Sequence, residues 1–220
     1  MEQGFLTEKK KISSIKHYET DTLKDLYMYN MGNVILQVTQ NCNLRCEYCV
    51  YSGSYINRVH TNKRMSFETA VKTIDFLAAH SLNCNEVSIG FYGGEPLLEI
   101  ELIKKAVSYA KEVFGEKKVN FNMTTNATLL NMDIADFLVQ NDFNITISLD
   151  GPRNIHNKNR IFANSNKGTF DLIMENIALI REKYPFFDKK ISFNAVIDLK
   201  QNVSCTNEFF LNYDTVKGLN

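Results

Sequence analysis

Apolar residues along this chain recur with two periods, one typical of buried strands and the other of amphipathic helices. Short runs rich in β-branched and aromatic residues predict five strands, at residues 34–39, 86–92, 119–125, 145–149 and 191–197. Apolar residues spaced three and four apart predict four intervening helices, at residues 65–80, 101–115, 132–140 and 169–184. The predicted order is a strict alternation of strand and helix.

Several predicted helices carry boundary signals. Ser66 and Thr169 precede apolar stripes, and we expect each to cap its helix. Gly115 is expected to end the second helix, and Pro185 follows the last one, which cannot continue through it. The segment before the first strand, residues 1–30, is polar and predicted to be loose.

Alternating strands and helices predict an α/β fold with a parallel sheet and right-handed crossovers. The pattern leaves open whether the sheet is doubly wound or curves into a (β/α) barrel. No G-x-G-x-x-G motif follows the first predicted strand, so the dinucleotide-binding wound sheet lacks its best signature. We divide the chain into the loose segment 1–30 and one domain, 31–220. Near the end of the sequence, the pattern of residues 208–218 predicts the start of a further helix. Residues 198–220 contain no clear sixth strand.

The composition is that of an ordinary globular protein, with 44% apolar and 23% charged residues. The 25 Lys and Arg residues balance the 25 Asp and Glu residues, which gives no support to a nucleic-acid partner. No apolar stretch approaches the roughly 20 residues of a membrane helix, and the polar N-terminus does not resemble a signal peptide. We therefore expect a cytoplasmic protein with reduced thiols that binds neither nucleic acid nor membranes.

Three of the five cysteines, Cys42, Cys46 and Cys49, have the spacing C-x3-C-x2-C. Structural zinc sites take four ligands, typically in C-x2-C pairs, and no second pair is present. In a zinc interpretation His60 is the candidate fourth ligand, because Cys84 precedes a strand and should lie at the opposite end of the sheet. A [4Fe–4S] cluster held by three thiolates leaves one iron open, which is the mark of a reactive site. The spacing therefore favours a cluster over zinc.

Other unusual residues also follow predicted strands. They are the sequences GGEP (93–96), TTN (124–126), SLDGP (148–152) with HNKNR (156–160) beyond it, and NAVID (194–198). Sites in parallel α/β folds gather at the C-terminal ends of strands. We therefore expect these residues and the three cysteines to share one face of the sheet.

The cysteine spacing, with the aromatic Tyr48 before the last cysteine, resembles the signature of the radical S-adenosylmethionine (radical SAM) superfamily. TQNCNLRCEYC, FYGGEPLL, TTNATLL and SLDGPRNIHNKNR, within residues 39–196, resemble its peptide- and protein-modifying branch. That SPASM-type branch includes anaerobic sulfatase-maturating enzymes and thioether-forming peptide maturases. Residues 51–70 are most similar to maturases of Cys-rich ribosomal peptides. The resemblance implies a partial TIM-like barrel with about five of six strands.

The resemblance also implies two cofactors, a [4Fe–4S] cluster on the three cysteines and S-adenosylmethionine (SAM) on its open iron. It implies that Gly93, Gly94 and Glu95 contact the amine of SAM, and that Ser148 and Arg160 contact its carboxylate and ribose. It also implies that Asn126 lies near the SAM pocket. Val196 and Tyr48 are expected beside the adenine. Paired glycines let backbone approach a ligand, a carboxylate suits an ammonium, and a guanidinium matches a carboxylate. In the family a glycine follows Asn126, whereas this chain has Ala127, so we expect the turn to differ.

Several of these assignments have a purely structural alternative. Residues 93–95 could instead be a Gly-rich turn with an acidic residue at the start of a helix. In the same way, Arg160 could form a surface ion pair, and Tyr48 could serve only as a packing contact. Asp150 is expected to shape the turn that follows it and not to act in catalysis. His156, placed in a loop, is expected to make local hydrogen bonds rather than transfer protons.

The implied activity is reductive cleavage of SAM to a 5′-deoxyadenosyl radical, which then modifies a peptide or protein side chain. Thioether formation in a Cys-rich ribosomal peptide is one example, with flavodoxin or ferredoxin as electron donor. Relatives continue into a SPASM domain with further cysteines, whereas here Cys205 stands alone, so we expect a truncated core. The alternatives are a catalytically incomplete fragment that binds cluster and SAM, and a zinc-binding structural module.

Overall fold

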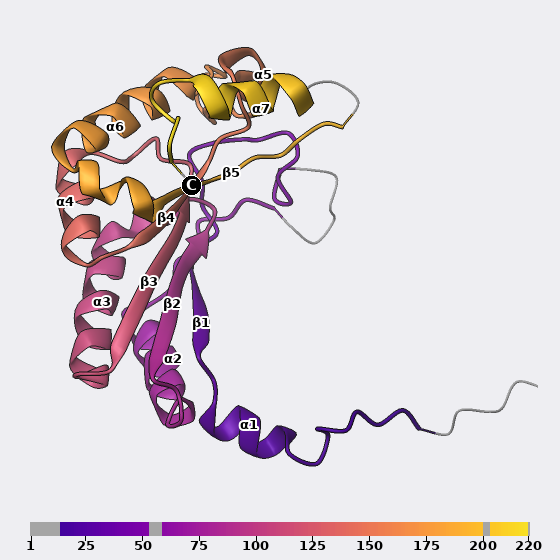
Figure 1. Cartoon of the computed structure of the whole chain (residues 1–220), viewed down its shortest axis with the longest axis vertical. Helices are drawn as coiled ribbons and strands as arrows, with labels where there is room; N and C mark the ends of the chain where they lie inside the picture. Colours follow the sequence, from indigo (N-terminus) through magenta and orange to yellow (C-terminus); the bar gives the residue numbers. More distant parts are fainter. Residues whose placement is uncertain (1–13, 53–58, 200–202, 220) are drawn as a thin grey trace, which may run out of the picture.

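A computed structural model describes residues 14–52, 59–199 and 203–219 (Figure 1). Five strands, each parallel to its neighbours, form one sheet in sequence order. They are β1 (Asn33–Thr39), β2 (Glu86–Gly93), β3 (Lys118–Thr125), β4 (Asn144–Ser148) and β5 (Ile191–Asn194). Sequential order with right-handed crossovers places the helices on one side of the sheet. The predicted partial (β/α) barrel is therefore confirmed, and β1 and β5 are unpaired edges within the described sheet.

The helices α2, α3, α4 and α6 lie along the outer side of the curved sheet (Figure 1). The complete set is α1 (Leu23–Tyr29), α2 (Phe67–His80), α3 (Ile100–Phe114), α4 (Met132–Gln140), α5 (Arg153–Asn159), α6 (Phe170–Lys183) and α7 (Val203–Asn212), with short 3-10 turns η1 (Pro96–Glu99) and η2 (Pro185–Lys190). The four predicted helices are thus confirmed. Ser66 caps α2 by accepting a hydrogen bond from the Thr69 amide, and Gly115 ends α3 with φ 56°.

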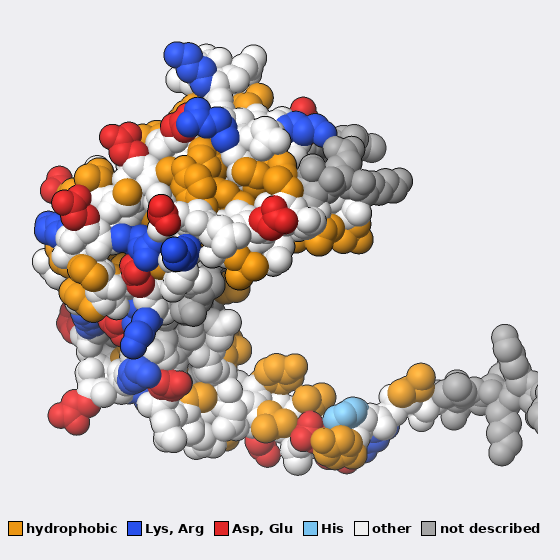
Figure 2. Space-filling model, turned by 45° about the horizontal axis from the view of Figure 1, so that its top comes forward, with side chains coloured by type: hydrophobic (Ala, Val, Ile, Leu, Met, Phe, Trp, Pro, Cys, Tyr) orange, Lys and Arg blue, Asp and Glu red, His pale blue; other side chains and the backbone are white. Residues whose placement is uncertain are grey.

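The two faces of the sheet differ in chemistry. Its outer face carries the buried core, in which the rings of Phe91, Phe121 and Phe143 stack with centroids 5.4 to 6.4 Å apart. Its inner face is polar, and the Asn122 amide donates a hydrogen bond of 2.6 Å to the Ser88 hydroxyl there. Figure 2 shows that the molecule is hollowed on one side.

Some local predictions were wrong. The segment predicted to be loose contains α1, a helix without buried residues. His156 lies on α5 and not in a loop; this helix is short and polar and has no apolar stripe to reveal it. The strand β5 ends at Asn194, three residues early, and the Val196 amide donates to the Asp150 side chain. Thr169 stands at the start of α6 but makes no capping hydrogen bond.

The last helix, α7 (Val203–Asn212), starts earlier than the predicted residues 208–218 and ends before their end. Residues 1–13 of the predicted loose segment lie outside the described residues. The same holds for residues 53–58 of the segment that resembles Cys-rich peptide maturases. In the described parts of the chain, no helix is long and apolar enough to cross a membrane.

Candidate metal and cofactor site

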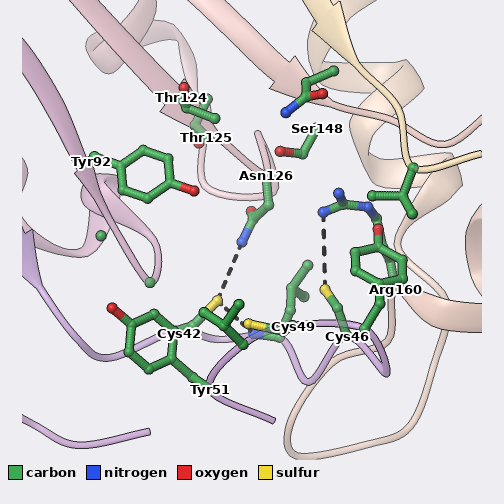
Figure 3. Close-up of a pocket in the computed structure, with 17 residues that line it drawn as sticks. Cys42, Cys46, Cys49, Tyr51, Tyr92, Thr124, Thr125, Asn126, Ser148 and Arg160 are labelled. Atoms are coloured by element: carbon green, nitrogen blue, oxygen red, sulfur yellow. Dashed lines mark hydrogen bonds between the residues drawn. The ribbon is translucent and has the colours of Figure 1, made fainter. Parts of the chain in front are cut away.

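A cavity of about 290 Å³ lies at the C-terminal ends of the strands (Figure 3). Every predicted site residue except Glu95 lines it. These residues are Cys42, Cys46, Tyr48, Cys49, Gly93, Gly94, Asn126, Ser148, Arg160 and Val196. The predicted convergence of five strand ends on one site is therefore confirmed, while the binding role of each residue remains a prediction.

The cysteine loop is held by backbone hydrogen bonds to the last residue of α5 and to the segment that follows it. The Arg45 amide donates to the Ile161 carbonyl at 2.9 Å, and the Glu47 amide donates to the Asn159 carbonyl at 3.1 Å. The Arg45 guanidinium folds back and donates to the Cys42 carbonyl at 2.8 Å. The two backbone bonds join residues more than 100 positions apart, so sequence reasoning could not find them.

The glycine pair brings the end of β2 against the chain that leads into the cysteines. The Gly94 amide donates to the Thr39 carbonyl at 3.0 Å, and the Glu95 amide donates to the Asn41 carbonyl at 2.9 Å. A Cβ on Gly94 would lie 2.1 Å from the Asn41 oxygen. Gly93 has φ +153°, and a Cβ there would lie 2.3 Å from the Thr39 oxygen. Both glycines are thus needed for backbone approach, whatever ligand the cavity takes.

The three cysteine side chains lie together at one side of the cavity (Figure 3). Burial raises the pKa of the Cys42 thiol to about 12, although the Leu44 amide donates to its sulfur. Burial also raises the pKa of Cys46, against the opposing effect of Arg160. Thiols in such surroundings keep their protons until a cation replaces them. The donor set therefore fits a metal centre bound through thiolates.

The zinc interpretation needs a fourth ligand beside the three cysteines. Among the described residues, no three His, Cys, Asp or Glu side chains lie close enough to share one metal ion. Each thiolate of a cluster binds a different iron, so a cluster does not require that convergence. The candidate fourth ligand, His60, pairs through Nε2 with the Ser52 hydroxyl at 2.7 Å. Cys84 lies near Gly32, before β1, as expected for the opposite end of the sheet.

Glu95 lies behind the cavity wall and is fully buried. Its Oε1 accepts hydrogen bonds from the Thr125 hydroxyl at 2.6 Å and the Leu97 amide at 3.0 Å. Its Oε2 accepts from the Asn126 amide at 2.7 Å. Burial raises the pKa of Glu95, and these donors oppose the shift. The implied contact of Glu95 with the SAM amine remains a prediction, and the structure gives its carboxylate three partners within the protein.

Asp150 is a site residue whose importance sequence reasoning missed. Its carboxylate accepts hydrogen bonds from the Tyr48 hydroxyl at 2.5 Å, from Arg160 Nε at 3.1 Å and from the Val196 amide at 3.1 Å. Arg160 is therefore not in a surface ion pair, because its partner is 1% exposed. The Tyr48 ring lies under the guanidinium, 5.4 Å from centroid to Cζ. An acid directly after a predicted strand was the signal available in the sequence.

Asn126 connects the end of β3 to the cysteine loop. Its Nδ2 donates to Asn43 Oδ1 at 2.9 Å and to Cys42 Sγ at 3.9 Å. Its Oδ1 accepts from the amide and the hydroxyl of Thr128. Ala127 takes the left-handed conformation with φ 58°, which glycine would adopt without strain. Ala127 thus forms a left-handed turn, and the expected difference from the family's turn stays a prediction.

His156 makes the local hydrogen bonds that were predicted for it. Its Nδ1 accepts from the Asp150 amide at 3.3 Å, and its Nε2 pairs with the Thr169 hydroxyl at 2.9 Å. That hydroxyl in turn donates to the Arg160 carbonyl at 3.3 Å. Burial lowers the pKa of His156 to about 4, so the ring is neutral at pH 7. It supports the loop that carries Arg160.

Comparison with known proteins gives consistent matches. A family model described as the radical SAM superfamily matches residues 36–209. An uncharacterized protein of Methanocaldococcus jannaschii is 38% identical over 71% of this chain and 51% of its own length. A cysteine-type anaerobic sulfatase-maturating enzyme of Clostridium novyi is 33% identical over 80% of this chain and 46% of its own length. This chain thus spans about half the length of the curated relatives it matches.

A solved structure of native anSMEcpe, with bound AdoMet and a Cp18Cys peptide, matches with a TM-score of 0.68. Its sequence identity to this chain is 26%, and the match covers 84% of this chain and 48% of the other. The match extends the similarity from sequence motifs to the arrangement of the strands and helices.

Proposed function

The chain belongs to the radical SAM superfamily, and from this we propose that Cys42, Cys46 and Cys49 hold a [4Fe–4S] cluster beside a SAM-binding cavity. The observation that carries the proposal is the convergence of three thiols with wall residues from all five strand ends. When bound, such a cluster supplies the electron that cleaves SAM into methionine and a 5′-deoxyadenosyl radical. The chain's own residues bind and orient the reactants.

The cavity wall supports specific roles for its residues. Ser148 and Arg160 offer a hydroxyl and a guanidinium to the SAM carboxylate and ribose. Backbone uncovered by Gly93 and Gly94 receives the ammonium group together with Glu95, whose carboxylate accepts three hydrogen bonds within the protein and has capacity for one more. The apolar Val196 provides a surface for the adenine.

We propose a peptide or protein side chain as the substrate. A second cavity of about 250 Å³ lies on the inner face of the sheet, and Tyr92 and Thr124 line both cavities. The amides and hydroxyls that face it, including those of Ser88 and Asn122, suit the uncharged polar groups of a peptide backbone. The solved relative with a bound peptide supports this class. Thioether formation in a Cys-rich peptide, a flavodoxin or ferredoxin donor and a cytoplasmic location are the finer parts of the proposal.

Anaerobic reconstitution with iron and sulfide tests this function. We expect about four irons per chain, and conversion of SAM to 5′-deoxyadenosine when dithionite is added. Cys46→Ala should lose both, whereas Cys205→Ala is the matched control because Cys205 is exposed and outside the cavity. Transfer of deuterium from a deuterated Cys-rich peptide into 5′-deoxyadenosine tests the substrate class.

The same experiment separates the alternatives. A chain that binds cluster and SAM, forms 5′-deoxyadenosine slowly and modifies no peptide is a catalytically incomplete fragment. One equivalent of zinc without iron, after purification in the absence of oxygen, indicates a structural zinc module. Either result contradicts the proposed activity.

A further inference from the structure

Two of the three candidate cluster ligands receive a side-chain N–H donor at sulfur. Asn126 Nδ2 lies 3.9 Å from Cys42 Sγ, and Arg160 Nη1 lies 3.9 Å from Cys46 Sγ. Figure 3 shows the two donors reaching the sulfurs from different sides of the cavity. Hydrogen bonds to sulfur are longer than those to oxygen, and these two lie at the long end of that range. These contacts exist within the protein itself and need no SAM.

The donor at Cys46 is held in place by a buried carboxylate. Asp150 accepts from Arg160 Nε, which leaves Nη1 directed at the sulfur. Asp150 also accepts from the Tyr48 hydroxyl, and the Tyr48 ring covers the guanidinium. The Arg160 and Asp150 side chains are 10% and 1% exposed, so water does not compete effectively for these bonds. The guanidinium therefore has one well-defined orientation.

The donor at Cys42 is held by the other buried carboxylate, through the backbone of Asn126. Glu95 accepts from the Asn126 backbone amide at 2.7 Å, which fixes the residue at the end of β3. Thr128 donates twice to Asn126 Oδ1, and this sets the amide so that Nδ2 faces the sulfur. Two independent carboxylates thus brace two independent donors.

We propose that Asp150 and Glu95 are positioning residues that hold Arg160 and Asn126 against the cysteine sulfurs, and that these donors raise the reduction potential of the cluster. A reduced cluster carries more negative charge on its sulfurs, so an N–H donor stabilises it more than the oxidised form. This role is additional to the SAM contacts implied for Arg160 and Asn126. It rests on the proposed function in requiring a bound cluster.

The test uses substitutions that conserve charge, so that a change in potential reports hydrogen bonding. In the full reconstituted chain, Arg160→Lys and Asn126→Ala each remove one donor, and Asp150→Glu displaces one carboxylate. We expect each to shift the midpoint potential of the SAM-free cluster to a more negative value in an anaerobic titration followed by electron paramagnetic resonance. We also expect higher Fe–S(Cys) stretching frequencies by resonance Raman spectroscopy. Arg181→Lys is the control, because Arg181 pairs with Asp188 away from the cavity.

The measurement without SAM separates the two roles. If a residue acts only through contact with SAM, its substitution leaves the midpoint potential and the Fe–S(Cys) stretching frequencies of the SAM-free cluster at the parent values. That result overturns the proposal. Iron content is read first, and failure of the parent chain to bind about four irons contradicts the proposed function instead. If a variant loads poorly, the Raman spectrum still reports on the fraction that carries a cluster. A shift equal to that of Arg181→Lys also overturns the proposal.

Discussion

The Tyr48 hydroxyl donates a hydrogen bond of 2.5 Å to the carboxylate of Asp150, which lies 102 residues further along the chain. This bond joins the cysteine loop to the end of β4 in the interior of the protein. Burial raises the pKa of Tyr48, and its hydrogen bond to the Asp150 carboxylate acts in the same direction, so the phenol keeps its proton as the donor. The contact links the metal site to the fold that supports it.

Tyr48→Phe should therefore destabilise the protein. Hydrogen bonds to charged groups contribute about 1.5–3 kcal/mol, so we expect a loss of that size in the free energy of unfolding. Urea denaturation of the metal-free chain measures it. Tyr109→Phe is the matched control, because the Tyr109 hydroxyl donates to Asp75 at an exposed position. Equal effects at the two tyrosines would show that the partly buried bond contributes no more than the exposed one.

Gly94→Ala should damage the site and the fold together. The new methyl group would lie 2.1 Å from the Asn41 carbonyl oxygen and 3.1 Å from Cys42 Cβ, so backbone must move. Overpacking of this kind costs about 1–3 kcal/mol, and we expect lower stability and fewer bound irons. Gly32→Ala is the control, since its nearest neighbour, Cys84 Sγ, is 3.9 Å away. A Gly94→Ala chain with full iron content and parent stability would refute this account of the glycine.

His156 should make the protein less stable in acid. Its pKa is about 4 in the folded protein and 6.5 ordinarily. Between those pH values the unfolded chain binds more protons, so the stabilisation is complete above pH 6.5 and is lost as pH falls toward 4. The difference corresponds to about 3 kcal/mol. Urea denaturation from pH 7.5 to 4 should show a smaller loss in His156→Gln than in the parent, and parallel curves would contradict the prediction.

Phe121→Ala should be among the most damaging core substitutions. Phe121 is 2% exposed and stacks against both Phe91 and Phe143. Removal of a buried phenylalanine leaves a cavity and costs about 3–5 kcal/mol of unfolding free energy. Phe186→Ala is the control, since Phe186 is 70% exposed and its loss should change stability by about 0.5 kcal/mol or less. Thermal and urea denaturation should rank the two variants in that order.

Much of the fold could be predicted because the spacing of apolar residues that indicates a helix or strand lies within that element itself. The apolar stripe of residues 101–115 and the alternation of 119–125 each fix an element from their own side chains, and the structure confirms both. The short polar helix α5 could not be predicted in this way, because it buries His156 and has no apolar stripe. The early end of β5 was not predicted either, and beyond it the Val196 amide donates to Asp150, 46 residues away in the sequence.

The sequence by itself determined the alternation of strands and helices, the cysteine spacing and the gathering of unusual residues after the strands, because each depends on near neighbours or on the regularity of parallel folds. Only the tertiary structure decided how those residues are held. Glu95 lies behind the wall and braces Asn126, while Asp150 joins Tyr48, Arg160 and Val196. Buried carboxylates need partners, and those partners come from distant segments that meet only when the sheet has formed.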